Sequence, residues 1–162
     1  MTPTIMLQLL FLLAVANGAP ILARNMLGDH FGQALDFDLI LYDKRRLLGP
    51  SKTIRGVIAA VALTGVAGIP FGMSFATGAI FGLCAMVGDL LSSFIKRRFN
   101  IKPSDSALGL DQGLEALFPL LFLAAHFELR STDIVILVVM FFFVEIALSR
   151  LLYWMHVRKR PL

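Results

Sequence analysis

Thirty-three consecutive residues, from Gly56 to Gly88, carry no charged side chain. As one helix with a rise of roughly 1.5 Å per residue, this run would be about 50 Å long, whereas the hydrocarbon core of a bilayer is about 30 Å thick. We therefore predict two membrane-spanning helices here. They are separated by a turn at Gly68-Ile69-Pro70-Phe71-Gly72, where proline and glycine favour reversal of the chain.

Apolar runs elsewhere in the chain raise the predicted number of spans to five. Hydrophobic residues make up 57% of the sequence and charged residues only 16%, against about 25% in soluble domains. This composition excludes a disordered chain, and the single cysteine, Cys84, excludes a disulfide scaffold. We predict an all-α integral membrane protein with a single transmembrane domain, residues 1–162. The predicted spans are 5–22, 56–71, 74–95, 114–129 and 134–154, with cytoplasmic loops 23–55 and 96–113.

Lysine and arginine are distributed very unevenly between these segments. Loop 23–55 holds six of them, loop 96–113 holds four, and the tail after the fifth span holds three. Only Arg130 lies on the opposite side, and Arg150 lies near the inner end of the fifth span. Because basic residues concentrate on the cytoplasmic side, we predict an external N-terminus and a cytoplasmic C-terminus. This bias accounts for the net charge of +4 without a nucleic-acid partner.

The segment from Gly49 to Gly56, directly before the second span, is the first candidate site. It contains Ser51, Lys52, Thr53 and Arg55, and helix N-termini with basic side chains bind phosphate well. It is not a Walker A loop, because Ser51 rather than glycine precedes Lys52. Two other interpretations stay open, namely that Ser51 or Thr53 only caps the helix, or that the basic side chains only contact lipid head groups.

Carboxylates in and near the membrane form the second candidate site. Asp89 falls inside the third span, where a charged side chain is costly and marks function by default. Lys96 lies on the same helix face, so a purely structural Asp89–Lys96 pair is the alternative. Asp111 and Glu115 are one turn apart at the start of the fourth span, where acids also suit the helix dipole. Mg²⁺ is the expected mediator between carboxylates and phosphates, and Asp89 and Asp111 are its predicted ligands.

Several of these segments together resemble the CDP-archaeol synthase family, a relative of the CDP-diacylglycerol synthases. The resemblance covers roughly Ala16 to Glu115. The pieces that carry it are Asn17-Gly18-Ala19-Pro20, the segment Arg46–Gly56, Gly88-Asp89 followed by Ser92-Ser93 and Lys96-Arg97-Arg98, Asp105-Ser106, and Leu110-Asp111-Gln112.

This resemblance implies Mg²⁺-dependent transfer of the cytidylyl group of CTP to a lipid phosphate, giving a CDP-lipid and pyrophosphate. It also implies roles for individual residues. The catalytic residues would be Lys52, Asp89 and Asp111. The residues that bind CTP and phosphate would be Asn17, Ser51, Lys52, Thr53, Arg55, Lys96, Arg97 and Arg98. The metal ligands would be Asp89, Asp111 and Glu115, where Glu115 is the acid nearest to Leu114, a position that is commonly aspartate in the family.

Two other functions stay open at this point. Intramembrane Asp89 and Glu145 could serve a small transporter, or the chain could be a non-catalytic membrane partner. Glu145 either pairs with another helix or lines the substrate cavity, and a homodimer that buries it is conceivable. We expect CTP, a lipid phosphate and membrane lipids as binding partners, with the active site facing the cytoplasm.

Overall fold

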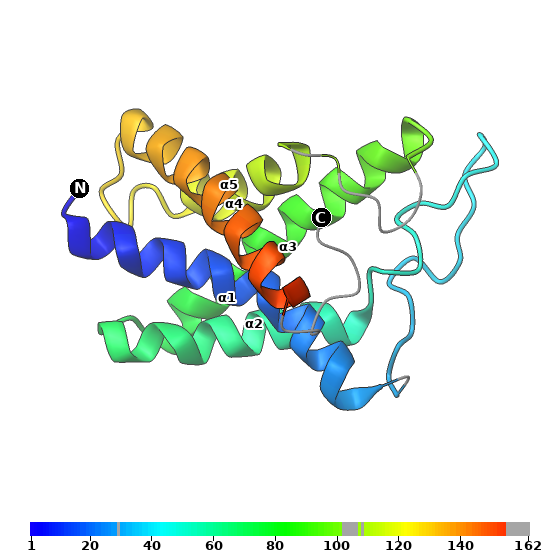
Figure 1. Cartoon of the computed structure of the whole chain (residues 1–162), viewed down its shortest axis with the longest axis horizontal. Helices are drawn as coiled ribbons and strands as arrows, with labels where there is room; N and C mark the ends of the chain where they lie inside the picture. The colour runs from blue at the N-terminus through cyan, green and yellow to red at the C-terminus, as the bar shows by residue number, and fades with distance from the viewer. Residues whose placement is uncertain (29, 102–106, 108, 155–162) are drawn as a thin grey trace.

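The protein is a bundle of α-helices, described here by a computed structural model (Figure 1). Residues 1–28, 30–101, 107 and 109–154 are described. The elements are α1 (Pro3–Leu27), α2 (Ile54–Gly68), the short 3-10 helix η1 (Ile69–Phe71), α3 (Phe75–Arg98), α4 (Leu110–Phe122) and α5 (Ser131–Trp154). The described residues are helical apart from loops and two isolated β-bridges in the loop between α1 and α2, so the predicted all-α class is confirmed.

The predicted turn inside the uncharged run is confirmed. After α2, Ile69, Pro70 and Phe71 form η1, and Gly72 then adopts a left-handed conformation with φ of 78°. That backbone angle suits glycine because it has no Cβ atom. Ser74 begins α3 by accepting a hydrogen bond from the Thr77 amide at 3.0 Å. Proline, glycine and a capping serine therefore reverse the chain where the sequence predicted it.

Helix α3 lies at the centre of the bundle and packs most extensively against α2 and α4. The approach to α2 is very close, because a Cβ atom on Gly82 would lie 2.8 Å from the carbonyl oxygen of Ala60. Gly88 is equally tight against α4, since its Cβ atom would lie 2.7 Å from the carbonyl carbon of Leu114 and 3.0 Å from the Cα atom of Glu115. Small residues thus let the backbones of three helices meet, as is common in membrane proteins.

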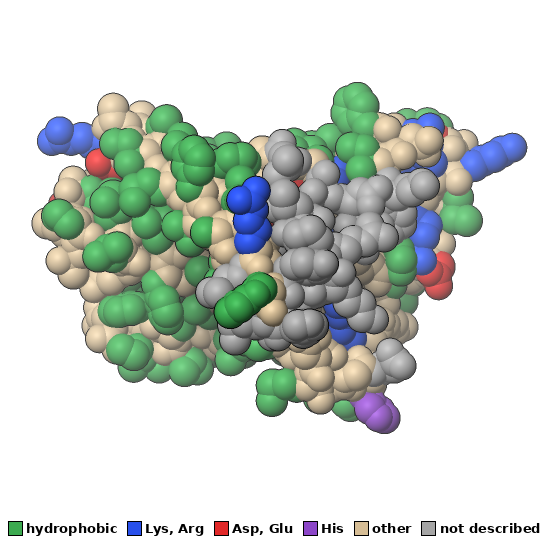
Figure 2. All heavy atoms as spheres, in the orientation of Figure 1, with side chains coloured by type: hydrophobic (Ala, Val, Ile, Leu, Met, Phe, Trp, Pro, Cys, Tyr) green, Lys and Arg blue, Asp and Glu red, His purple; other side chains and the backbone are tan. Residues whose placement is uncertain are grey.

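The two ends of the bundle differ in character. One end, called the loop end here, carries residues 30–53 and the C-terminus of α3, whereas the N-terminus and the connections around η1 and between α4 and α5 lie at the other (Figure 1). Figure 2 shows hydrophobic side chains over much of the helical part of one face, and lysine and arginine side chains gathered toward the loop end. The basic residues of loop 23–55 and of the end of α3 thus lie at one end of an apolar bundle.

Four helical segments among the described residues are long and apolar enough to cross a membrane: Pro3–Leu27, Ile54–Phe71, Phe75–Arg98 and Ser131–Arg150. Helix α4 has 13 residues, which corresponds to only about 20 Å. It ends at Phe122, seven residues before the predicted end of the fourth span, because the following residues form the turn that leads to α5. A fifth crossing therefore stays a prediction.

We predict that Gly88→Ala lowers the thermal stability of the protein. The new methyl group would meet the α4 backbone, which cannot move aside as a flexible side chain would, and overpacking typically costs about 1–3 kcal/mol. Thermal unfolding in detergent is the measurement. The matched control is Gly18→Ala, because nothing lies within 4 Å of the new Cβ atom there, and helix propensity predicts a small gain. A wild-type melting temperature for Gly88→Ala would contradict the close α3–α4 approach.

Candidate functional site

The loop between α1 and α2 folds back on itself and thereby positions Lys52. The Leu35 amide donates to the Lys52 carbonyl at 2.8 Å, and the Ile54 amide donates to the Gln33 carbonyl at 3.1 Å. Farther out, Ile40 and Arg46 form a second antiparallel bridge. We call residues 33–54 the hairpin loop. Its pairing fixes the backbone of Lys52 at the end of the loop, directly before α2.

Asp36 organises this hairpin loop, although the sequence analysis did not single it out. Its buried carboxylate accepts hydrogen bonds from the Leu48 amide at 3.1 Å, the Gly49 amide at 2.8 Å and the Arg46 guanidinium at 2.6 Å. Burial acts to raise the pKa of Asp36, but the Arg46 hydrogen bond and the two backbone amides hold it well below its usual value. Asp36 therefore stays ionised and anchors the turn that precedes Ser51 and Lys52.

Arginine side chains fasten the hairpin loop to the end of α3. Arg45 donates to the backbone carbonyls of Arg97 and Arg98 at the C-terminus of α3, where helix carbonyls need partners from outside the helix. Arg98 in turn donates to the Arg46 carbonyl at 2.7 Å and pairs with Asp43 at 2.7 Å. The basic residues of loop 23–55 and those at the end of α3 thus connect the two segments to each other.

Lys52 reaches from the hairpin loop into the helix bundle and meets Asp89. Its ammonium nitrogen contacts both carboxylate oxygens, at 2.5 and 2.6 Å, and both side chains are largely buried. Burial opposes the charged form of Lys52, but Asp89, followed by Glu115 and Asp111, raises its pKa above the usual value. The two residues that the sequence analysis placed in separate candidate sites therefore belong to one site.

A second lysine–carboxylate pair lies beside the first. Lys96 contacts both carboxylate oxygens of Asp111 at 2.8 Å, and its charge also acts on Asp89, its alternative partner on this helix face. Glu115, one turn after Asp111 on α4, adjoins the Asp89 carboxylate. We call Lys52, Asp89, Lys96, Asp111 and Glu115 the charged cluster.

Glu145 of α5 lies close enough to Glu115 for its charge to act on that side chain. Both possibilities from the sequence, pairing with another helix and lining the substrate cavity, stay predictions. The cluster is thus approached from the hairpin loop and from three helices, with two more buried polar side chains, Ser92 and Ser93, on the same stretch of α3.

Asp89 and Asp111 are the members of the charged cluster whose side chains could contribute to a cation site. In this structure Lys52 and Lys96 neutralise these two carboxylates. Carboxylate oxygens are hard ligands that suit Mg²⁺. Within the described part of the chain, no three His, Cys, Asp or Glu side chains are grouped tightly enough to hold a metal by themselves. Mg²⁺ commonly binds one or two carboxylates and completes its shell with phosphates and water.

The remaining predicted phosphate ligands make other contacts in this structure. Thr53 accepts from the Gly56 amide at 3.3 Å and caps α2, which was its structural alternative. Arg55 donates to the carbonyls of Gly28 and His30, and Asn17 donates to the Leu13 carbonyl at 3.2 Å within α1. Ser51 is exposed on the turn. In these contacts Thr53, Arg55 and Asn17 bind backbone groups and not members of the charged cluster.

The guanidinium of Arg97 lies beside Gly49, at about 3.9 Å from the position of a Cβ atom there, and its side chain is buried. It therefore connects α3 to the turn that Asp36 holds. The predicted cytoplasmic residues Lys102, Asp105, Ser106, Arg158, Lys159 and Arg160 lie outside the described residues.

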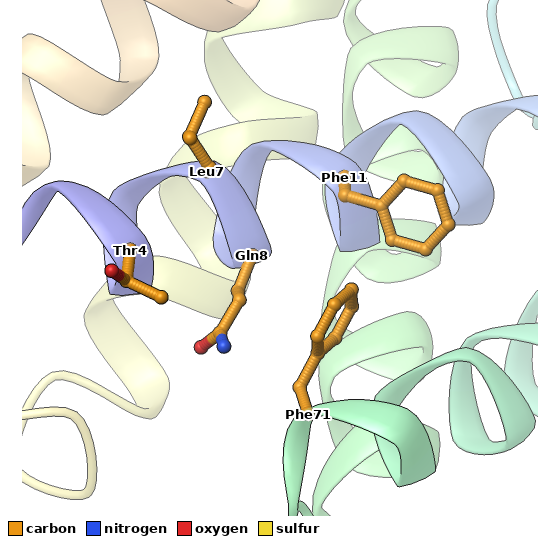
Figure 3. Close-up of a pocket in the computed structure, with 5 residues that line it drawn as sticks. All are labelled: Thr4, Leu7, Gln8, Phe11 and Phe71. Carbon is orange, nitrogen blue, oxygen red and sulfur yellow. The ribbon is translucent and has the colours of Figure 1, made fainter.

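A groove of about 480 Å³ lies at the end of α1 opposite the loop end (Figure 3). Thr4, Leu7, Gln8 and Phe11 of α1 line it together with Phe71, whose ring meets that of Phe11 edge to face at 5.6 Å. None of these five described lining residues is basic.

Known proteins similar to this chain point to one family. The sequence model of the CarS-like CDP-archaeol synthase family matches residues 2–160. The CDP-archaeol synthase of Sulfurisphaera tokodaii is 30% identical over 91% of this chain and 89% of its own length. The CDP-archaeol synthase of Pyrococcus furiosus is 35% identical over 60% of each chain.

A solved structure of an intramembrane enzyme for archaeal membrane lipid biosynthesis has the same fold. It superposes with a TM-score of 0.75 at 28% identity, covering 88% of this chain and 90% of its own. With the apolar helices, this match identifies an integral membrane protein. The comparisons also confirm the resemblance that the motifs carried.

We predict that Asp36→Asn destabilises the hairpin loop by about 2–3 kcal/mol, because an amide loses the charge and turns a donor toward backbone N–H groups. Asp38→Asn is the matched control, since Asp38 pairs with the same Arg46 but is 80% exposed. Hydrogen exchange of the Leu48 and Gly49 amides is the measurement, and equal loss of protection in both variants would contradict the anchoring role.

The Asp36 contribution should also depend on pH in one direction. Because its pKa is lowered in the folded protein, the contribution is fully present above about pH 4, the unfolded value, and is lost as pH falls through the folded pKa. The difference between the wild type and Asp36→Asn should therefore be largest at neutral pH and vanish in strong acid.

Proposed function

The chain belongs to the CDP-archaeol synthase family, and we propose that it transfers the cytidylyl group of CTP to a membrane lipid phosphate, giving a CDP-activated lipid of the archaeol type and pyrophosphate. The observation that carries this proposal is the charged cluster. It joins a lysine of the hairpin loop to carboxylates of α3 and α4 at one end of a membrane bundle. CTP would arrive there from water, and the lipid phosphate would arrive from the bilayer.

Lys52 and Lys96 would bind the triphosphate and the lipid phosphate, because compact ammonium groups on flexible stems pair well with phosphate oxygens. Arg97 adds positive charge beside the turn at Gly49. Thr53 and Arg55 would contribute mainly by fixing the start of α2, given the contacts they make. Two anionic substrates repel each other, so holding them together is the main task of these residues.

In the proposed reaction, an oxygen of the lipid phosphate attacks the α-phosphorus of CTP. A new P–O bond forms to that phosphorus, and its bond to the oxygen that bridges to the β-phosphate breaks. Pyrophosphate leaves with the electron pair. The attacking oxygen is already anionic, so no protein group has to remove a proton. Catalysis then depends on positioning and on neutralising charge, as in other phosphoryl-type displacements.

Asp89 and Asp111 would hold Mg²⁺, with Glu115 beside Asp89 as a further ligand. The bound ion would supply charge neutralisation on the phosphates. The structure supports Glu115 in this role, because Leu114 packs its backbone against Gly88 while Glu115 adjoins Asp89. Glu115 would then serve in place of the aspartate that the family commonly has at the position of Leu114.

We further propose that the loop end faces the cytoplasm, with the N-terminus outside and α4 completing five spans. Support comes from the gathering of basic side chains at that end and from the supply of CTP in the cytosol. A homodimer stays a prediction from the sequence.

The proposed function predicts that purified protein in detergent converts radiolabelled CTP, Mg²⁺ and a lipid phosphate to a CDP-lipid. The panel should include ether-linked isoprenoid and ester-linked acyl phosphates, because the apolar faces do not distinguish these chains. Product with the ether-linked substrate is expected. Absence of product across the panel, from protein that remains folded, would sink the proposed activity.

Asp89→Asn should lower turnover by at least about a hundredfold, because metal-ion charge stabilisation is worth several kcal/mol and each 1.4 kcal/mol is tenfold in rate. The matched control is Glu128→Gln, an exposed carboxylate at the opposite end of the bundle, which should leave turnover unchanged. Wild-type turnover in Asp89→Asn would remove Asp89 from the catalytic site.

A further inference from the structure

We propose that Lys52 and Lys96 occupy the positions that the divalent cation would take at Asp89 and Asp111. They do so until CTP binds and its phosphates pair with the two ammonium groups instead. Free Mg²⁺ and free CTP would then each bind weakly, whereas each would strengthen the binding of the other. This inference rests on the proposed function and adds how its site is loaded.

The geometry of the two pairs carries the argument. Each ammonium group contacts both oxygens of its carboxylate, Lys52 at 2.5 and 2.6 Å and Lys96 at 2.8 Å. Each ammonium group therefore occupies the side of its carboxylate from which a metal ion could reach both oxygens. A Mg²⁺ ion bound at about 2 Å would also stand beside the ammonium group, and two positive charges repel strongly where little water screens them.

The lysines cannot simply be released into water. The side chains of Lys52 and Lys96 are 20% and 9% exposed, and those of Asp89 and Asp111 are 14% and 13% exposed. Separating such a buried pair leaves an uncompensated charge on either side, which is strongly unfavourable. A triphosphate removes this obstacle, because its oxygens offer the lysines new partners at the moment the carboxylates become available.

Movement of side chains is sufficient for this exchange. The backbone of Lys52 is held by the Leu35 amide and by its own amide, which donates to the Gly49 carbonyl at 3.3 Å. Lys96 is held within α3. Each has a flexible four-carbon stem with three donors at its tip, so the ammonium group can turn from carboxylate to phosphate while the loop and helix stay in place.

Binding linkage makes the effect reciprocal. If CTP raises the affinity of the site for Mg²⁺ by some factor, Mg²⁺ raises the affinity for CTP by the same factor. The charged cluster is therefore built for the metal and the nucleotide together and disfavours either one alone.

The test measures binding of Mn²⁺ alone, without nucleotide, by electron paramagnetic resonance on the purified full chain. Lys52→Met should bind Mn²⁺ at least tenfold more tightly than the wild type, because Asp89 is then open. The same variant should bind CTP at least tenfold more weakly in EDTA. Opposite changes for the two ligands are expected only if Lys52 serves both. The control Lys44→Met removes the same charge from the exposed tip of the hairpin loop and should change neither.

Stability provides a second measurement where Lys52→Met folds poorly. Mn²⁺ should raise the melting temperature of Lys52→Met and of Lys96→Met by several degrees more than that of the wild type, since it replaces the missing positive charge. Unchanged Mn²⁺ affinity together with an unchanged melting shift in both variants would overturn the exchange. Because these readouts use no turnover, a wild type that makes CDP-lipid while the variants fail this test would refute only the exchange. A wild type that makes none would refute the proposed function.

Discussion

The ion pair between Lys52 and Asp89 is the contact on which the site depends. It joins a loop residue outside the membrane helices to a carboxylate buried between them. An unpaired charge at either position would be costly, so each residue makes the other tolerable. The hairpin loop, its fastening to α3 and the close α3–α4 approach all bring these two groups together with Lys96 and Asp111. These parts of the fold therefore position the Lys52–Asp89 pair.

Most of that support comes from charged side chains that bind backbone groups. Asp36 holds two amides of the hairpin loop, Arg45 holds two carbonyls at the end of α3, and Arg55 holds two carbonyls beyond α1. Charged side chains that bind backbone atoms restrict a loop without adding bulk. The segment that we propose binds phosphate is thereby held in place by the protein itself, which would reduce the ordering that binding requires.

Much of the fold and part of the site followed from the sequence. The uncharged run, its proline–glycine turn and the pattern of apolar segments predicted the helices, since periodicity and turn residues are local properties. Lys52, Asp89 and Asp111 also stood out as candidate site residues, because charge near a membrane is rare. Their pairing was not, because spacing along one helix favoured Asp89–Lys96, whereas the partners came from the hairpin loop and α4. Asp36 was missed because its role depends on amides more than ten residues away, which no local pattern reveals.

The position of Gly49-Pro50-Ser51-Lys52 before α2 has a consequence for how the protein is made. Lys52 precedes α2 and Asp89 lies in α3, and the two helices are joined by the short turn at η1. Asp89 is unfavourable for insertion of α3 as an isolated segment. Its contact with Lys52 exists only when α2 and α3 lie side by side. The charge that α3 brings into the membrane is therefore compensated within one pair of adjacent helices.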